Sequence, residues 1–163
     1  PYKELGISRT ATEKEIKKGK RKSGFKSKKY SMYAFFGDFN PYDQLVIYTE
    51  RKDKSYIIKS VAGFMNFEKN WEGCLKEQEA VSNQVQKLFS NTKKTVKEFA
   101  HPNDKTGNSL EKDVIFALNT GEEIGSACQK WGKKYKAKRS KIDTIQVFMD
   151  TKEYAAWLRS QGH

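Results

Sequence analysis

Residues 44–67, QLVIYTERKDKSYIIKSVAGFMNF, decide the fold class of this chain. The segments 44–50 and 55–67 are rich in β-branched and aromatic residues, which is typical of strands, and the polar residues 51–54 between them are typical of a turn. Upstream, residues 29–39 (KYSMYAFFGDF) form another aromatic run, and residues 40–43 (NPYD) are a strong turn signal. Because these links are too short for a parallel crossover, the sequence predicts a three-stranded antiparallel meander.

The second half of the chain repeats this pattern after a long helix. The helix is predicted over residues 68–100, because apolar residues recur there in steps of three and four and Pro102 ends the pattern. Strands are then expected over 113–118 (DVIFAL), 123–131 (EIGSACQKW) and 143–149 (DTIQVFM), the first two joined by the tight-turn sequence NTGE. The basic residues 132–141 between the last two strands are expected to be a loop or a strand extension. Asp150 and Glu153 are expected to cap a final helix.

These segments give an α+β fold with antiparallel sheet, in the order α-βββ-α-βββ-α, with a weak βββα repeat. Residues 1–29 are expected to be a basic helical arm and residues 30–163 the α+β domain. The arm helix would start at a capping box made by Thr12 and Glu15. From Glu13 to Gly24 its only large apolar residue is Ile16, so it would have little surface to bury.

The first 22 residues contain a Tyr-x-x-Leu-Gly-Ile-Ser motif and a Lys-rich helix start, and they resemble the beginning of a J-domain. The positions that fit the family pattern are Tyr2, Leu5, Gly6, Ile7, Ser8, Ala11, Thr12, Glu15, Ile16, Lys17, Lys18, Arg21 and Lys22. The His-Pro-Asp loop with which that family stimulates its DnaK-type chaperone partner would fall near residues 29–31, where this chain has Lys-Tyr-Ser. The resemblance therefore implies a J-like start without the J activity, either as a retained basic arm or as a chance helix start.

The net charge of +12 is concentrated in two runs that contain no acidic residue. The first run, between Glu15 and Asp38, contains Lys17, Lys18, Lys20, Arg21, Lys22, Lys26, Lys28 and Lys29. The second run, between Glu123 and Asp143, contains Lys130, Lys133, Lys134, Lys136, Lys138, Arg139 and Lys141. These runs hold 15 of the 32 basic residues, so the rest of the chain is close to neutral. A solvated, solubilising surface is the simpler explanation, but two acid-free runs favour a polyanionic partner.

The leading hypothesis from the sequence is a non-enzymatic protein that binds DNA or RNA through its backbone, in a salt-dependent and non-specific way. Lysine outnumbers arginine in both runs, which favours point-charge contacts over base readout. Tyr30 and Tyr135 are candidates for stacking on the bases of a single strand, with core packing as the alternative for the aromatic residues near the runs. The two runs are expected to emerge side by side and to form one positive surface. The competing hypothesis is a protein–protein adaptor whose arm docks an acidic or chaperone partner.

The sequence contains no catalytic or cofactor signature. Two cysteines and two histidines without paired spacing cannot form a zinc site, phosphate-loop motifs are absent, and no cofactor is predicted. His101, beside Pro102, is expected to be solvated. Cys74 and Cys128 are expected to be buried, as free thiols in preference to a disulfide, and an intracellular location is favoured; a secreted basic protein with bridged cysteines is the alternative. No segment is long enough to span a membrane, and the start at Pro1 instead of Met leaves room for a leader removed upstream.

Overall fold

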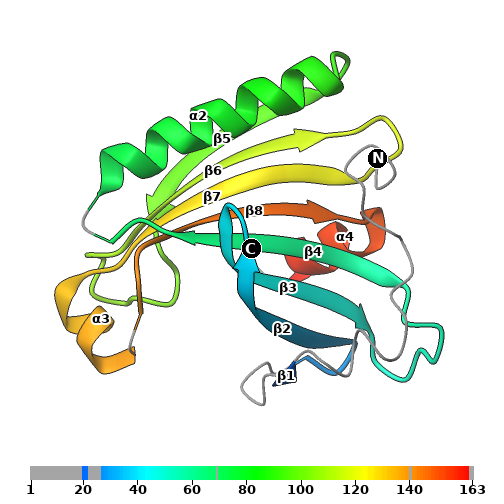
Figure 1. Ribbon diagram of the computed structural model, residues 1–163, viewed down its shortest axis with the longest axis horizontal. Helices are drawn as coiled ribbons and strands as arrows, with labels where there is room; N and C mark the ends of the chain where they lie inside the picture. Colours follow the sequence, from blue (N-terminus) through cyan, green and yellow to red (C-terminus); the bar gives the residue numbers. More distant parts are fainter. Residues whose placement is uncertain (1–19, 22–26, 69, 140, 162–163) are drawn as a thin grey trace.

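The computed structural model describes residues 20–21, 27–68, 70–139 and 141–161. Within these described residues, three helices and eight strands, one of them only two residues long, form an α+β fold around a single antiparallel sheet (Figure 1). The strands are β1 (Lys20–Arg21), β2 (Tyr30–Phe39), β3 (Tyr42–Glu50), β4 (Ile58–Asn66), β5 (Lys93–Ala100), β6 (Leu110–Ala117), β7 (Glu123–Lys130) and β8 (Thr144–Asp150). The helices are α2 (Trp71–Leu88), α3 (Lys133–Arg139) and α4 (Lys152–Ser160).

The sheet is built from two meanders that join through their last strands. Its strand order is β1-β2-β3-β4-β8-β7-β6-β5, and every pairing is antiparallel. The central β4–β8 pair places Ser60 opposite Asp150 and Asn66 opposite Thr144. The first meander, β2-β3-β4, is therefore confirmed, and β6, β7 and β8 form a second meander that is followed by a helix, as predicted.

Helix α2 covers one face of the second meander. It begins at the N-cap Asn70, whose side chain accepts a hydrogen bond from the backbone N–H of Gly73 at 2.9 Å, and its contacts are with β6, β7 and β8. Val85 of this helix packs in a buried cluster with Phe116, Ile124 and Met149. Burial of such side chains contributes about 1.5–3 kcal/mol each to folding, so α2 is held by the core of the sheet.

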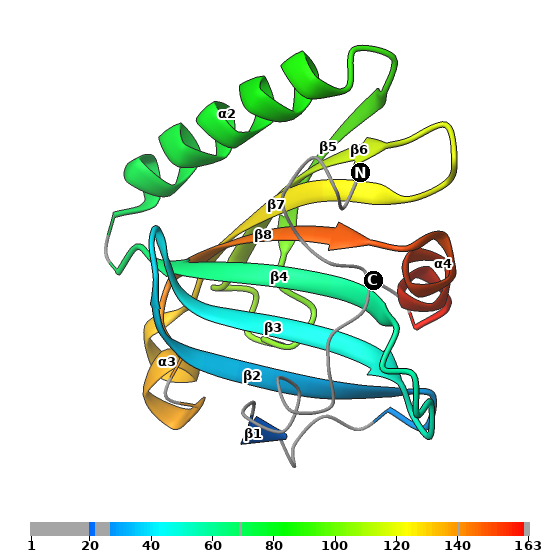
Figure 2. The same ribbon diagram turned by 45° about the vertical axis from the view of Figure 1, so that its right-hand side comes forward.

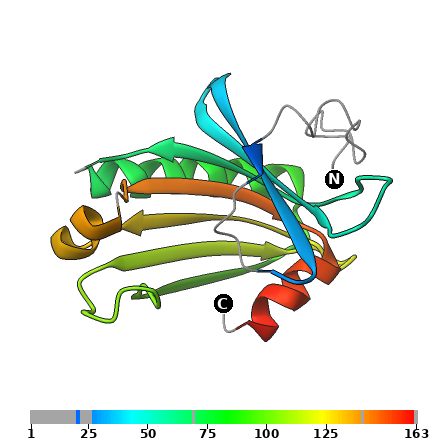
Figure 3. The ribbon, with the colours of Figure 1, turned by 90° about the horizontal axis from the view of Figure 1, so that it is seen from below.

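Helix α4 lies on the opposite face, at the end of the sheet where β8 stops (Figures 1 and 3). Its N-cap is Thr151, one residue after the predicted Asp150, and the Thr151 side chain accepts from Tyr154 N–H. The Tyr154 ring meets Tyr30 of β2 at 4.9 Å and Tyr48 of β3 at 5.0 Å between centroids. The two helices that follow the two meanders thus lie on different faces.

The predicted helix over 68–100 is wrong in its second part. Helix α2 ends at Leu88, and Lys93–Ala100 forms strand β5, paired along its whole length with β6. The three-residue step from Val96 to Phe99 continued the helical spacing by coincidence, because in the strand these two side chains point to opposite faces of the sheet. The element order therefore differs from the predicted α-βββ-α-βββ-α, because the second half contains a fourth strand, β5, and a further helix, α3, between β7 and β8.

The basic residues 132–141 are not a loop or strand extension as predicted. Lys133–Arg139 forms helix α3, which consists of Lys, Arg, Ala and Tyr without Gly, Pro or β-branched residues. Lys20–Arg21 forms β1 beside Ala34 and Tyr33 of β2. The expectation that these two residues belong to a helix was therefore wrong. The rest of the predicted arm helix and of the J-like stretch lies outside the described residues.

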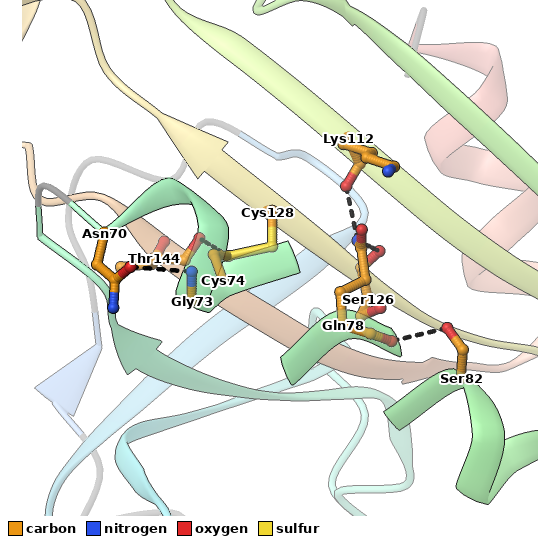
Figure 4. Close-up of a disulfide and its surroundings, with 9 residues drawn as sticks. All are labelled: Asn70, Gly73, Cys74, Gln78, Ser82, Lys112, Ser126, Cys128 and Thr144. Atoms are coloured by element: carbon orange, nitrogen blue, oxygen red, sulfur yellow. Dashed lines mark hydrogen bonds between the residues drawn. A yellow bond between two sulfur atoms is a disulfide. The ribbon is translucent and has the colours of Figure 1, made fainter. Parts of the chain in front are cut away.

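Cys74 and Cys128 form a disulfide, so the preference for free thiols was wrong, although both side chains are buried as predicted (Figure 4). The bond joins the first turn of α2 to β7 across 54 residues of sequence. One turn further along α2, the buried Gln78 donates from Nε2 to the backbone oxygens of Lys112 (2.8 Å) and Ser126 (3.1 Å). A covalent bond and a polar clamp therefore fix the first half of α2 on the sheet.

Candidate functional site

The second basic run forms a lysine-covered end of the molecule, built on helix α3. Lys130, Lys133, Lys134, Lys138 and Lys141 are all exposed, and these five residues are named the α3 surface below. Lys130 ends β7, and Lys133 and Lys134 open α3. Lys138 is in the last turn of α3, and Lys141 follows the helix. The structure thus brings most of the second predicted run onto one short helix and its flanks.

An aromatic stack holds α3 in place. Trp131, directly before the helix, is 7% exposed and lies between two rings. The His101 ring is 4.2 Å from it and the Tyr135 ring of α3 stacks on it at 5.2 Å with an interplanar angle of 13°. Lys141 Nζ lies 4.9 Å from the centre of the Trp131 ring, within the range of a cation–π contact. Trp131 is therefore a core residue, the alternative raised for the aromatic residues near the runs.

A buried carboxylate, Asp143, fixes both ends of the connection that contains α3. Its Oδ1 accepts from the backbone N–H of Trp131 at 2.8 Å, and its Oδ2 accepts from Lys136 Nζ at 3.0 Å. Lys136 Nζ also lies 3.3 Å from Glu68 Oε1. Burial alone would lower the pKa of Lys136, but the hydrogen bonds to Asp143 and Glu68 outweigh it and raise the pKa. Lys136 is thus a structural cation rather than part of the exposed surface.

The loop between β5 and β6 supports the start of α3. Gly132 N–H donates to Ser109 Oγ at 2.9 Å, and the Ser109 hydroxyl donates to Asp104. Hydrogen bonds from Ser109 and Thr106 lower the pKa of Asp104. A side chain at Gly132 would come within 2.8 Å of Asn108 Cβ, so only glycine allows this close approach. The β5–β6 loop and the start of α3, which are far apart in sequence, therefore form one hydrogen-bonded support for the lysines of α3.

The first basic run is not brought beside the second one by the residues that the structure describes. Lys28 and Lys29 are exposed and directly precede β2, at the end of the sheet where α4 packs. The α3 surface lies at the opposite end of the strands (Figure 2). The expected single positive surface is therefore wrong for these residues. Lys20 and Arg21 lie in β1 beside the middle of β2, and Lys17, Lys18, Lys22 and Lys26 lie outside the described residues.

Of the two tyrosines expected to stack on bases, Tyr30 is contradicted by its burial. Its ring is 0% exposed and packs against Tyr154 and Trp157 of α4. Tyr135 is half-buried and uses one ring face against Trp131. Arg139 is part of α3. The α3 surface consequently offers charges and few aromatic faces.

A half-buried acidic pair, Glu111 and Asp113, lies near the β5–β6 loop and was missed in the sequence. Glu111 and Asp113 alternate along β6, so they share one sheet face. Burial, reinforced by the neighbouring Asp113, raises the pKa of Glu111, and burial also raises the pKa of Asp113. His101 is buried, not solvated as predicted; its Nδ1 accepts from Asn103 N–H at 3.2 Å, so its Nε2 faces Glu111 at 3.1 Å as the donor. The Glu-x-Asp alternation was the available signal.

The described part of the chain contains no group of three or more His, Cys, Asp or Glu side chains placed to bind a metal ion. A hollow of about 60 Å³ lies beside the disulfide, lined by Phe67, Trp71, Cys74, Gln129, Lys130 and Asp143. Small-molecule sites usually enclose about 300–1,000 Å³. This hollow is therefore too small for a typical small-molecule ligand, and the α3 surface itself consists of exposed, charged side chains.

Comparison with protein-family models, with curated proteins and with solved structures finds no match to this chain. None of the described helices is both long and apolar enough to cross a membrane. The arguments about function below therefore rest on the chain's own geometry and charge.

Proposed function

We propose that the α3 surface binds the phosphate backbone of a nucleic acid. The observation that supports this proposal is the arrangement of charge around α3: five exposed lysines lie on it and its flanks, whereas the neighbouring carboxylates Asp143 and Glu68 both pair with the less exposed Lys136. Clustered lysines attract a polyphosphate, and binding gains free energy from the release of its counterions. Lysine makes point-charge contacts without reading bases.

The aromatic residues near the two basic runs do not form a platform for base stacking, so the proposed binding depends on charge. Tyr30 and Trp131 are buried, and Tyr135 lies flat on Trp131. Base stacking contributes about 1–3 kcal/mol per base where rings are free, and little of that is accessible on this surface. Affinity should therefore depend on salt and polymer length rather than on base sequence or strandedness.

Two variants with the same net charge test this proposal. Replacement of Lys130, Lys133, Lys134 and Lys138 by Gln removes four charges from the α3 surface. Replacement of Lys52, Lys54, Lys76 and Lys87 by Gln removes four charges from exposed positions elsewhere. Binding to a 30-nucleotide DNA is measured by fluorescence anisotropy from about 25 to 200 mM salt. The first variant should lose about three units of the log–log salt slope and the second should keep the slope of the parent protein.

Equal losses in the two variants would show that only net charge matters, and the proposal would then fail. Absence of binding at 25 mM salt would contradict the proposal directly.

The Cys74–Cys128 disulfide is typical of oxidising compartments, where sulfated polysaccharides are common polyanions, so heparin is titrated in parallel. Binding of heparin without binding of DNA or RNA would assign the surface to sulfate instead. The adaptor hypothesis depends on the N-terminal arm, most of which lies outside the described residues.

A further inference from the structure

Strand β5 forms one edge of the sheet, and its outer side carries no partner among the described residues. It pairs with β6 only and stands last in the strand order (Figure 3). Six of its eight residues are exposed, including Val96 at 53%. The main contacts of helix α2 are with β6, β7 and β8. An open edge of this length can pair with another strand.

The hydrogen bonds to β6 fix which backbone groups of β5 point outward. His101 N–H donates to Ser109 O at 2.8 Å, directly beyond the paired residues Ala100 and Leu110. In an antiparallel ladder, hydrogen-bonded pairs recur at every second residue. The N–H and C=O groups of the odd-numbered residues of β5 therefore face β6, whereas those of Lys94, Val96 and Glu98 face away from the sheet.

This alternation restricts how two copies of β5 can pair. A second antiparallel β5 must place its own outward-facing residues opposite Lys94, Val96 and Glu98. In one such register the two-fold axis passes through Val96, so that Val96 faces Val96 and Lys94 faces Glu98 twice. On the other side of the strand, Thr95 then faces Lys97 and Lys93 faces Phe99. Opposite charges and paired β-branched residues directly across from each other stabilise a sheet.

The other registers that satisfy the backbone bring like charges together. A shift of the axis to Lys97 places two Lys97 side chains opposite each other, and a shift to Thr95 places Lys93 opposite Lys97. Larger shifts place Lys94 opposite Lys94 or Glu98 opposite Glu98. Like charges directly opposite destabilise a strand pair. The sequence of β5 thus disfavours general edge pairing, as edge lysines commonly do, and favours one register.

We infer that β5 pairs with β5 of a second copy of this chain, about a two-fold axis through Val96, and joins two sheets into one. Such an isologous contact uses the same surface on both copies and closes the assembly at a dimer. It removes the exposed Val96 side chains from water and pairs the outward N–H and C=O groups. This inference is independent of the function proposed for the α3 surface.

A charge-swap experiment tests the register. Sedimentation velocity of the full chain between about 1 and 200 μM should show a concentration-dependent dimer. Lys94→Glu leaves only Glu–Glu pairs in the dimer, Glu98→Lys leaves only Lys–Lys pairs, and each should weaken dimerisation at least about tenfold. A mixture of these two variants contains only Glu–Lys pairs across the contact, so the mixed dimer should form where neither variant dimerises alone.

Two controls separate the register from charge and from folding. Lys93→Glu makes the same charge change on the same strand but faces Phe99, and it should change the dissociation constant less than about threefold. Val96→Pro removes an N–H that faces away from β6, so the circular dichroism spectrum should be kept while the dimer is lost. A monomer at all concentrations, equal effects of Lys93→Glu and Lys94→Glu, or no recovery in the mixture would each overturn the inference.

Discussion

Helices α3 and α4 are both short and both stand next to β8, but they are attached in different ways. Helix α4 buries Tyr154 and Ala155 and packs its aromatic rings against Tyr30 and Tyr48 on the sheet. Helix α3 is attached by Trp131, which precedes it and stacks on Tyr135, by the Asp143–Lys136 ion pair and by the hydrogen bond from Gly132 to Ser109.

The difference explains how a helix can consist almost entirely of basic residues. An amphipathic helix needs an apolar stripe to bind the core, and α4 uses its stripe in this way. Helix α3 takes its position from residues on either side of it, Trp131 and Asp143, so most of its own side chains are free to face water. Because flanking residues hold α3 in place, its own exposed side chains can be basic without weakening the attachment of the helix, which suits a surface that binds a polyanion.

The largest expected effect comes from removing the tyrosine that anchors α4. Tyr154→Ala should lower the free energy of unfolding by about 3–5 kcal/mol, because it leaves a cavity beside Tyr30 and deprives Tyr48 of its hydrogen-bond partner. The matched change in α3, Tyr135→Ala, should cost about 1 kcal/mol, since that ring is half-buried. Urea unfolding of both variants measures the difference; equal losses would contradict the distinction between the two helices.

The next effect concerns Asp150, which is buried beneath α4. Burial, together with the charge of Glu123, raises its pKa to about 7, although the Ser60 hydroxyl opposes this shift. A raised pKa in the folded state means that the stabilisation is complete below about pH 4 and is lost as the pH rises through about 7. Asp150→Asn should therefore be more stable than the parent protein at pH 8, by up to about 4 kcal/mol, with little difference at pH 4.

Thermal unfolding across pH 4–8 measures this effect. Part of the pH dependence should remain in Asp150→Asn, because the pKa values of Glu111 and Asp113 are raised in the same direction by their burial. The exposed carboxyl variant Glu79→Gln, which lies outside the proposed β5 contact, serves as a control and should follow the parent curve. A parent protein whose stability rises steadily from pH 4 to pH 8 would refute the assignment.

A smaller and more local effect is expected at α3. Asp143→Asn keeps one acceptor but presents an amide to Lys136, and it should cost about 2 kcal/mol. Amide exchange should accelerate in residues 131–141 and stay unchanged in α4. Glu68 is the outer, half-exposed partner of Lys136, so Glu68→Gln should cost less than about 0.5 kcal/mol. Equal acceleration of exchange in α4 would indicate global destabilisation instead.

The strands of both meanders were predictable because their alternation, β-branched residues and turn signals are local properties of the sequence. Strand β5 was not, because Val96 and Phe99 lie three residues apart, which fits one face of a helix and not the two-residue alternation of a strand. The strand forms through its pairing with β6, which is not visible in the local sequence. The end of α2 at Leu88 depends on the polar turn that follows, which the apolar spacing did not reveal.

The site was predictable as a list of lysines and not as a surface. Charge runs are visible in sequence, but the sheet topology decides that Lys28 and Lys29 emerge at one end of the strands and the α3 surface at the other. Helix α3 itself depends on Asp143 and Ser109, which lie outside the helix and reach it through tertiary contacts. Tyr30 was misassigned because the docking of α4, which buries it, is a long-range contact.

The disulfide between α2 and β7 makes a closed covalent ring of residues 74–128. Every described connection of the second half up to β7, including the exposed loop between β5 and β6, lies inside this ring. A protease that cuts once in that loop therefore opens the ring without separating the protein into two pieces. Under non-reducing conditions such a nicked molecule keeps its full mass, so an intact band would be no proof of an uncut chain.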